Sequence, residues 1–389
     1  MTAAGRGGRT VFLSAGESSG DLHGAHLARE LLRRDPGLRL VGLGGSRMRE
    51  AGVELMADLD TLAVMGFAEV LRSLPELLRL RWRVRRWIER EDVDLLVPID
   101  YPGFNLSLAC HASDRDVPVL YYIAPQVWAW RARRARKLAR CTDRICVVLP
   151  FEERFLAEYG ADVRFVGHPL LDGEGPIPGP ETEGRAGADP RRPDDPSDPP
   201  VLGVFPGSRA QEVERILPPF RRAARRLQAR RPELEVRVAR APDLPRGLFA
   251  DAPGELATPE AVLETARAAL TKSGTVTLQL ALAGVPMVVG YRVNPLTFLL
   301  ARQLVDVDHV ALANLVAGRE VVPELIQGEL TPERLVDEVE PLLEPGSGRR
   351  RRMCRELAEV RERLGEPGCT ARVADEAVAL MGDAGGDDG

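Results

Sequence analysis

The sequence has few cysteines, no excess of charge of one sign and no long unbroken apolar run, and each absence excludes a class of protein. The five cysteines include no CxxC pair and no neighbouring histidine cluster, so neither a zinc site nor a disulfide framework is encoded, and we expect reduced thiols. The 53 Lys and Arg against 58 Asp and Glu give a net charge of −5, which argues against a surface built to hold nucleic acid.

Two apolar runs are too short or too interrupted to be targeting or membrane-spanning segments. Residues 11–15 are shorter than a signal-peptide core and lead into polar residues, so we expect a buried strand. Residues 273–291 carry no charge but are interrupted by Gly284 and Pro286, which favours a helix followed by a buried strand. We therefore expect a cytoplasmic protein, with peripheral membrane contact left open.

Short runs rich in Val, Leu and Ile alternate with longer helical patterns along the chain. This alternation is typical of βαβ units and predicts an α/β fold with mainly parallel sheets. The expected helices include residues 21–34 and 210–230. The expected strands are residues 11–15, 39–43, 94–99, 117–123, 145–149, 201–205, 235–239, 268–271 and 286–289.

A stretch poor in apolar residues divides this pattern in two. Residues 172–200 are rich in Gly, Pro, Asp, Glu and Arg, a composition that cannot bury a core, so we expect a disordered linker there. On either side, residues 1–171 and 201–345 are expected to form two doubly wound Rossmann-like domains that face each other across a cleft. Residues 346–381 should be helices that can pack back on the N-terminal domain, and residues 382–389 a frayed tail.

Two strand ends in the N-terminal domain carry residues suited to chemistry. Residues 15–21, AGESSGD, form a strand-to-helix turn whose backbone amides could approach a ligand, or a plain turn capped by Ser19 or Asp21. This turn lacks a full GxGxxG, which argues against a dinucleotide site. Residues 98–105, PIDYPGFN, place Asp100 just beyond a strand, where it could deprotonate an acceptor hydroxyl or instead cap the next helix.

Two strand ends in the C-terminal domain are suited to holding phosphate. Residues 205–209, FPGSR, join a strand, a glycine turn and a helix start, with Arg209 ready for phosphate oxygens. A solvated arginine beside an ordinary turn is the alternative. Residues 271–279, TKSGTVTLQ, repeat the arrangement with hydroxyls and amides, although Ser273 and Thr275 could merely cap the helix.

These segments occur in the order seen in lipid-A-disaccharide synthases, and the chain resembles that family from about Thr10 to Leu343. The most distinctive match is PQVWAW at residues 125–130, because two tryptophans in this setting rarely arise by chance. The other matches are residues 63–66 (AVMG), 149–152 (LPFE), 166–168 (VGH), 206–209 (PGSR) and 314–320 (NLVAGRE).

The resemblance implies an inverting glycosyltransferase of the GT-B type that needs neither a metal nor a cofactor. The implied donor is UDP-2,3-diacylglucosamine, the implied acceptor is 2,3-diacylglucosamine 1-phosphate, and the implied products are the β-1,6-linked disaccharide phosphate of lipid A and UDP. No nucleic acid is implied as a partner, and the chain could form a homodimer.

The resemblance also divides the roles among residues. Asp100 is implied to be the base for the acceptor 6-hydroxyl, with Glu17 near it as a second catalytic candidate. The residues implied to bind the UDP-sugar are Ser208, Arg209, Ser273, Gly274, Thr275, Gln279, Asn314 and Glu320. Two positions depart from the family: Gln279 stands where the family often has a glutamate, and Gly103 stands where a second acid can follow Asp100. Asp100 would then act alone, and Gln279 could still bind a diol through its amide.

An apolar segment followed by a basic one is suited to acylated substrates and to a membrane surface. The residues expected to contact acyl chains or the bilayer are Val64, Met65, Phe67, Val70, Leu71, Leu74, Arg81 and Arg85. A core-packed helix with a solvated basic face is the alternative. This apolar segment argues against a related transferase or epimerase for a soluble UDP-sugar, and the presence of Asp100 and Arg209 argues against a non-catalytic lipid-binding protein.

Overall fold

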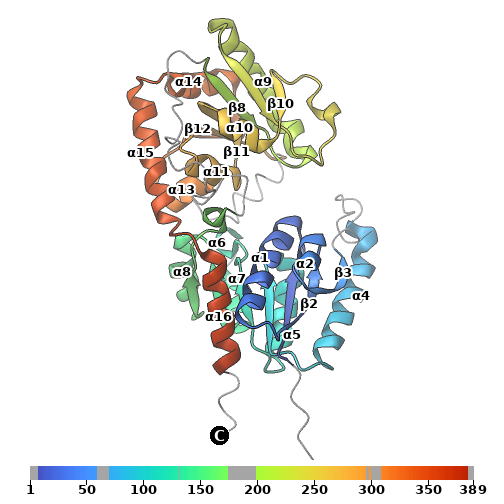
Figure 1. Ribbon diagram of the computed structural model, residues 1–389. Coiled ribbons are helices and arrows are strands. Elements are labelled where there is room, and N and C mark those ends of the chain that lie inside the picture. The colour runs from blue at the N-terminus through green and yellow to red at the C-terminus, as the bar shows by residue number, and fades with distance from the viewer. Residues whose placement is uncertain are drawn as a thin grey trace, which may run out of the picture. The chain divides into compact units, whose positions relative to one another are not determined.

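The structure is a computed structural model that describes residues 8–58, 70–130, 132–173, 199–294, 298 and 308–383 (Figure 1). The chain divides into two compact units, one formed by Met1–Glu174 with Glu366–Gly389 and the other by Gly175–Gly365. Most of the expected linker, residues 174–198, and the end of the expected tail, residues 384–389, lie outside the described residues. Among the described residues, no helix is both long and apolar enough to cross a membrane.

The first unit is built on a seven-stranded parallel sheet in the order β3-β2-β1-β4-β5-β6-β7. Its strands are β1 (Thr10–Ala15), β2 (Arg39–Gly44), β3 (Glu54–Asp58), β4 (Leu95–Ile99), β5 (Leu120–Tyr122), β6 (Arg144–Val147) and β7 (Val163–Phe165). Its helices are α1 (Ser18–Arg34), α2 (Ser46–Glu50), α4 (Val70–Ile88), α5 (Pro102–Ser113), α6 (Val127–Trp130), α7 (Ala132–Arg140), α8 (Pro150–Ala157) and α16 (Cys369–Asp383), with the 3-10 turn η1 (Pro169–Asp172).

The second unit repeats this architecture with a six-stranded parallel sheet in the order β10-β9-β8-β11-β12-β13. Its strands are β8 (Val201–Phe205), β9 (Glu235–Ala239), β10 (Glu255–Ala257), β11 (Ala268–Lys272), β12 (Met287–Tyr291) and β13 (Glu324–Ile326). Its helices are α9 (Ala210–Arg230), α10 (Pro259–Thr265), α11 (Val276–Leu282), α13 (Leu312–Ala317), α14 (Pro332–Leu343) and α15 (Gly348–Arg363), with the 3-10 turns η2 (Arg246–Phe249) and η3 (Gln327–Glu329).

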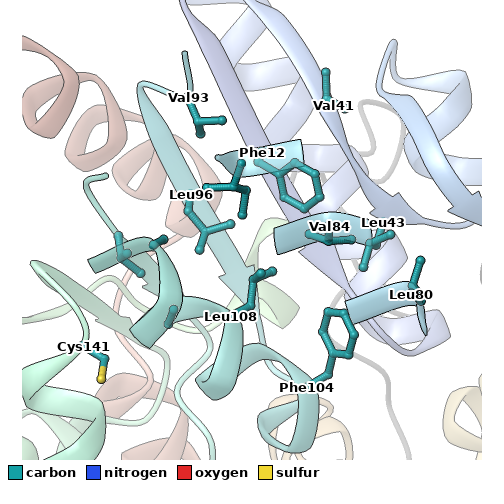
Figure 2. Packing of buried hydrophobic residues seen from close by; sticks show 14 residues of the cluster. Phe12, Val41, Leu43, Leu80, Val84, Val93, Leu96, Phe104, Leu108 and Cys141 are labelled. Atoms are coloured by element: carbon teal, nitrogen blue, oxygen red, sulfur yellow. The ribbon is translucent and has the colours of Figure 1, made fainter. Parts of the chain in front are cut away.

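Apolar side chains from the strands and from two helices pack together on one face of the first sheet. Figure 2 shows Phe12 of β1 and Leu96 of β4 beside Val84 of α4 and Leu108 of α5. All four side chains are buried from solvent. Because α4 and α5 cover this face, the loops at the carboxyl ends of β1 and β4 are held on a rigid base.

The C-terminal helix α16 belongs to the first unit, whereas α15 belongs to the second. The Asp172 carboxylate accepts hydrogen bonds from the backbone amides of Gly368, Cys369 and Thr370, at 2.5, 3.0 and 2.9 Å. On its other side α16 contacts α1, where Arg34 donates to the backbone carbonyl of Ala371 at 2.8 Å. The first domain is therefore completed by a segment from the far end of the chain.

The expectation of reduced thiols is wrong for one pair of cysteines. Cys110 on α5 and Cys141, which follows α7, form a disulfide with Cα atoms 4.5 Å apart. The two residues are 31 positions apart in sequence, a spacing that does not by itself indicate a pair. Cys146, Cys354 and Cys369 are free thiols.

Candidate functional site

In each sheet the strand order reverses at one point, and the predicted motifs lie at these points. In the first sheet β1 and β4 are neighbours, and Ala15 pairs with Ile99 at their carboxyl ends. In the second sheet β8 and β11 are neighbours, and Phe205 pairs with Thr271. Doubly wound sheets bind ligands in the crevice where the order reverses, because the loops there diverge to opposite faces.

Asp100 lies at the first of these points in a strained backbone conformation. Asp100 and Tyr101 both have left-handed φ angles, of 45° and 50°. The Tyr121 hydroxyl and the Asn105 side-chain amide donate to the backbone carbonyl of Asp100, at 2.8 and 2.9 Å. Non-glycine residues keep such angles only when surrounding contacts hold them, and this strain is common at functional sites.

Asn105, which the sequence analysis did not single out, is the centre of this support. Its side chain is fully buried on α5. Its Nδ2 atom donates to the carbonyls of Ser14, Ile99 and Asp100 at 2.9, 3.1 and 2.9 Å, while its Oδ1 accepts from the Ser14 hydroxyl at 2.7 Å. One amide therefore connects the ends of β1 and β4 to the turn that carries Asp100.

The carboxyl of Asp100 is half-buried, and its pKa is raised. Burial is the main cause, the negative charge of Glu17 adds to it, and the Tyr101 amide and His23 act in the opposite direction. The N-cap of α5 is Tyr101, so the alternative in which Asp100 caps this helix is wrong. A base with a raised pKa is better matched to accepting a proton near neutral pH.

The turn between β1 and α1 brings Glu17 to the same edge of the sheet. Glu17 is exposed and occupies the N-cap position of α1, so the alternative in which Ser19 or Asp21 caps this helix is wrong. The Asp21 carboxylate instead accepts from the backbone amides of Gly45 and Met48, at 2.6 and 3.1 Å. A Cβ atom on Gly16 would lie 2.1 Å from the Tyr101 ring, so only glycine allows the two loops to approach this closely.

Two further residues missed by the sequence analysis lie near Asp100. Glu152, in the first turn of α8, is buried and accepts from the indole N–H of Trp128 at 2.9 Å. Burial raises the pKa of Glu152 to about 7; the N–H groups of Trp128, Leu149 and Val148 lower it, and the charge of Asp100 raises it. His23, on α1, has its ring 6.2 Å from that of Tyr122 in an edge-on arrangement.

In the second unit, the β8–α9 turn presents the predicted phosphate ligands. Arg209 is the N-cap of α9 and its side chain is 70% exposed. Gly207 has a φ of 126°, which a residue with a side chain rarely adopts. The backbone amide of Ser208 donates to the carboxylate of Glu212 at 3.2 Å. Backbone N–H groups, an exposed guanidinium and a helix N-terminus lie together at this turn, which suits an anion.

The β11–α11 turn holds the second group of predicted ligands. Gly274 has a φ of 155°, and Thr275 is exposed at the N-cap of α11 without a side-chain capping bond. The Ser273 hydroxyl donates to the carbonyl of Val310 at 2.5 Å, so the alternative in which these two side chains merely cap the helix is wrong. Gln279 lies half-buried one turn into α11.

The side chain of Asn314 is enclosed by the protein and is not open to a ligand. It is fully buried on α13, where Nδ2 donates to the Val322 carbonyl and to Glu324 at 2.9 and 2.7 Å. Its Oδ1 accepts from the amides of Val321 and Val322 at 2.8 and 2.9 Å. All four hydrogen-bonding positions of the amide are in use. Glu320, by contrast, is exposed.

Helix α4 carries the described part of the expected acyl and membrane surface. Val64, Met65 and Phe67 lie outside the described residues, and Val70, Leu71 and Leu74 belong to α4 without a description of their side chains. The guanidinium of Arg85 donates to the hydroxyl of Ser107 at 2.7 Å, and both Arg81 and Arg85 are half-buried.

The exposed side of α4 carries other residues instead. Leu78 and Trp82 are 45% and 57% exposed. The guanidinium of Arg86 lies 4.8 Å from the centre of the Trp82 ring, and Arg79 and Arg83 are exposed. We call Leu78, Arg79, Trp82, Arg83 and Arg86 the exposed face of α4. Among the described residues, no group of three or more His, Cys, Asp or Glu side chains is placed to hold a metal ion.

Comparison with solved structures shows the fold. The glycosyltransferase of kitacinnamycin aligns with a TM-score of 0.62 at 19% identity, covering 97% of this chain and 100% of that one. Staphylococcus aureus MnaA, solved with UDP, aligns with a TM-score of 0.64 at 12% identity, covering 96% and 97%. The expected α/β fold with two parallel-sheet domains of the GT-B type is confirmed.

Comparison of sequences shows the family. A family model described as lipid-A-disaccharide synthetase matches residues 11–372. Relatives named lipid-A-disaccharide synthase include the Geobacter sulfurreducens protein, 42% identical over 96% of this chain and 97% of that one, and the Anaeromyxobacter sp. (strain K) protein, 43% identical over 95% and 97%. The Myxococcus xanthus relative is 40% identical over 95% and 97%. The chain therefore belongs to the lipid-A-disaccharide synthase family of glycosyltransferases.

Proposed function

We propose that the enzyme transfers 2,3-diacylglucosamine from UDP to the 6-hydroxyl of 2,3-diacylglucosamine 1-phosphate, with inversion at the anomeric carbon. The observation that carries this proposal is Asp100, a half-buried carboxyl with a raised pKa, held on a strained turn at the point where the strand order reverses. The family match supports the class of reaction, and the identity of both substrates rests on the family's name and on the residues below.

The first unit supplies the base for the proposed reaction. The acceptor 6-hydroxyl oxygen attacks the anomeric carbon as its proton passes to the ionised Asp100 carboxylate. The bond between the anomeric carbon and the diphosphate oxygen breaks, and its electron pair leaves with UDP. Glu17 raises the pKa of Asp100 through its charge, after the larger effect of burial, and thereby makes Asp100 a stronger base.

The second unit supplies the binding site for the UDP group in this proposal. The amide of Ser208, the guanidinium of Arg209 and the turn at Gly274 and Thr275 are suited to the diphosphate, because they combine N–H donors with positive charge. Gln279 and the exposed Glu320 remain candidates for sugar or ribose hydroxyls. For Asn314 we propose a positioning role, because its hydrogen bonds connect α13 to Glu324 at the start of β13.

We also propose that the exposed face of α4 contacts the surface of the inner membrane from the cytoplasmic side. An exposed tryptophan and leucine next to three exposed arginines match the chemistry of an anionic lipid interface. The acyl chains of both proposed substrates would reach the enzyme from the same surface. A homodimer stays a prediction.

Product analysis tests the proposal. Purified protein is incubated with UDP-2,3-diacylglucosamine and the monosaccharide 1-phosphate, UDP release is measured, and the disaccharide is examined by mass spectrometry and by NMR of its anomeric proton. We expect equal amounts of UDP and of a β-linked disaccharide phosphate. UDP without disaccharide, or an α-linkage, would contradict the proposed acceptor or the proposed inversion.

A further inference from the structure

In the second sheet, at the point where the strand order reverses, hydrogen-bond donors from two separate loops contact one carboxylate. Glu212, in the first turn of α9, accepts from the ammonium of Lys272 at 2.8 Å through Oε1. The same oxygen lies 3.4 Å from Nη1 of Arg209, and Oε2 accepts from the amide of Ser208 at 3.2 Å. Lys272 is the last residue of β11, and Ser208 and Arg209 follow β8. The two loops are thus linked by a carboxylate.

This carboxylate lies against the glycine turn itself. A Cβ atom on Gly207 would approach Oε2 of Glu212 to 2.6 Å. A Cβ atom on Gly274 would lie 3.6 Å from the Lys272 ammonium, so that ammonium also borders the turn that precedes α11. Carboxylate and phosphate oxygens accept the same charge-assisted hydrogen bonds. Glu212 therefore makes, with these groups, the bonds that a bound phosphate would make.

The charges of this cluster indicate that a bound diphosphate would displace the Glu212 carboxylate rather than bind beside it. The side chains of Glu212 and Lys272 are only 19% and 21% exposed. Burial would raise the pKa of Glu212, but the hydrogen bond and charge of Lys272 and the charge of Arg209 outweigh it and lower the pKa, so Glu212 is ionised at neutral pH. A diphosphate next to an ionised carboxylate in a partly desolvated site would meet strong repulsion.

We propose that Lys272 is a further ligand of the leaving diphosphate and that the Glu212 carboxylate occupies the diphosphate position until the donor binds and displaces it. This inference rests on the proposed function, because it takes the second unit to bind the UDP group. When the bond to the anomeric carbon breaks, negative charge develops on the leaving diphosphate, and Lys272 and Arg209 stabilise it there. In the free enzyme Glu212 keeps both cations paired and in place.

Calorimetric titration of UDP into the full-length protein tests this inference. Glu212→Gln removes the competing charge but keeps an acceptor for the Ser208 amide, so we expect UDP to bind about five- to tenfold more tightly than to wild type. Lys272→Met should weaken UDP binding by about tenfold or more. Uridine, which lacks phosphate, should bind all three proteins equally. Weaker or unchanged UDP binding by Glu212→Gln would overturn the displacement of Glu212, and unchanged binding by Lys272→Met would overturn the role of Lys272.

A matched ion pair in the same unit provides the control. Arg230 of α9 contacts Glu340 of α14 at 2.8 Å, and Glu340→Gln should leave UDP binding unchanged. If Glu340→Gln tightens UDP binding as Glu212→Gln does, the effect is one of overall charge and the inference fails. Failure of the proposed function gives a different result, in which folded wild-type protein binds no UDP and forms no disaccharide.

Discussion

The indole N–H of Trp128 donates a hydrogen bond to Oε1 of Glu152 at 2.9 Å. This bond connects helix α6 to helix α8, and the rings of Trp128 and Phe151 also pack in a T-shaped arrangement with centres 5.1 Å apart. Oε2 of the same carboxylate accepts from the amide of Leu149 at 3.2 Å. The motif at residues 125–130 and the motif at residues 149–152 therefore contact each other, and the charge of Asp100 acts on the carboxyl of Glu152 in this contact.

Glu152→Gln should change how stability depends on pH. Because the folded-state pKa of Glu152 is raised from 4.5 to about 7, its contribution to stability is full below about pH 4.5 and is lost as pH rises through about 7. Between pH 5 and pH 8 the free energy of unfolding of wild type should therefore fall by about 3 kcal/mol more than that of Glu152→Gln. Urea denaturation at the two pH values measures this, and equal slopes for both proteins would contradict it.

Glu17→Gln should move the pH profile of the reaction. The charge of Glu17 contributes, after burial, to the raised pKa of Asp100, so its removal should lower that pKa. A general base acts in its ionised form, so the acid limb of kcat/KM should shift to lower pH in Glu17→Gln. Glu17→Asp keeps the charge and should leave the limb in place. Loss of activity at every pH in Glu17→Gln would show that Glu17 takes part directly.

Asn105→Ala should destabilise the first domain and reduce the rate. The substitution leaves the Ser14 hydroxyl and the carbonyls around Asp100 without their buried partner, which costs about 2 to 4 kcal/mol of unfolding free energy. Because the strained turn at Asp100 and Tyr101 loses its support, kcat should fall by about tenfold or more. A kcat equal to wild type in folded Asn105→Ala would contradict this positioning role.

If the exposed face of α4 contacts the membrane, removal of its apolar side chains should weaken vesicle binding. Replacing Leu78 and Trp82 by serine removes the apolar part of the exposed face of α4 and should weaken binding to phosphatidylglycerol vesicles by about tenfold or more. Val378→Ser, at the other large apolar side chain found exposed among the described residues, should have no effect. Sedimentation with vesicles measures both variants. Equal losses in the two would show that α4 is not a specific membrane contact.

The fold could be predicted from the sequence wherever an element is long or strongly apolar. Strands β8 and β9 and helix α9 have the predicted bounds, and α9 continues through Pro218 and Pro219. The edge strands β3, β7, β10 and β13 were not predicted, because each is short and only partly buried, so that no apolar run marks it.

The sequence predicts the parts of the site that lie within one segment, but not the contacts between segments. Asp100 directly follows one predicted strand, and Arg209 lies four residues after another; the structure places both where the strand order reverses. Asn105, Glu152 and the disulfide of Cys110 with Cys141 depend on contacts between segments far apart in the sequence. No local pattern marks a residue whose role is to hold another segment.

The role of Asp100 as the base is tested most directly by the rate of disaccharide formation, compared between wild type and Asp100→Asn with both substrates at saturation. The asparagine keeps the size of the side chain but cannot accept the proton, so kcat should fall by about 100-fold or more. UDP binding by calorimetry should stay unchanged in the same variant, because Asp100 has no proposed contact with the diphosphate. A kcat within about threefold of wild type, a difference of less than about 1 kcal/mol, would show that Asp100 is not the base.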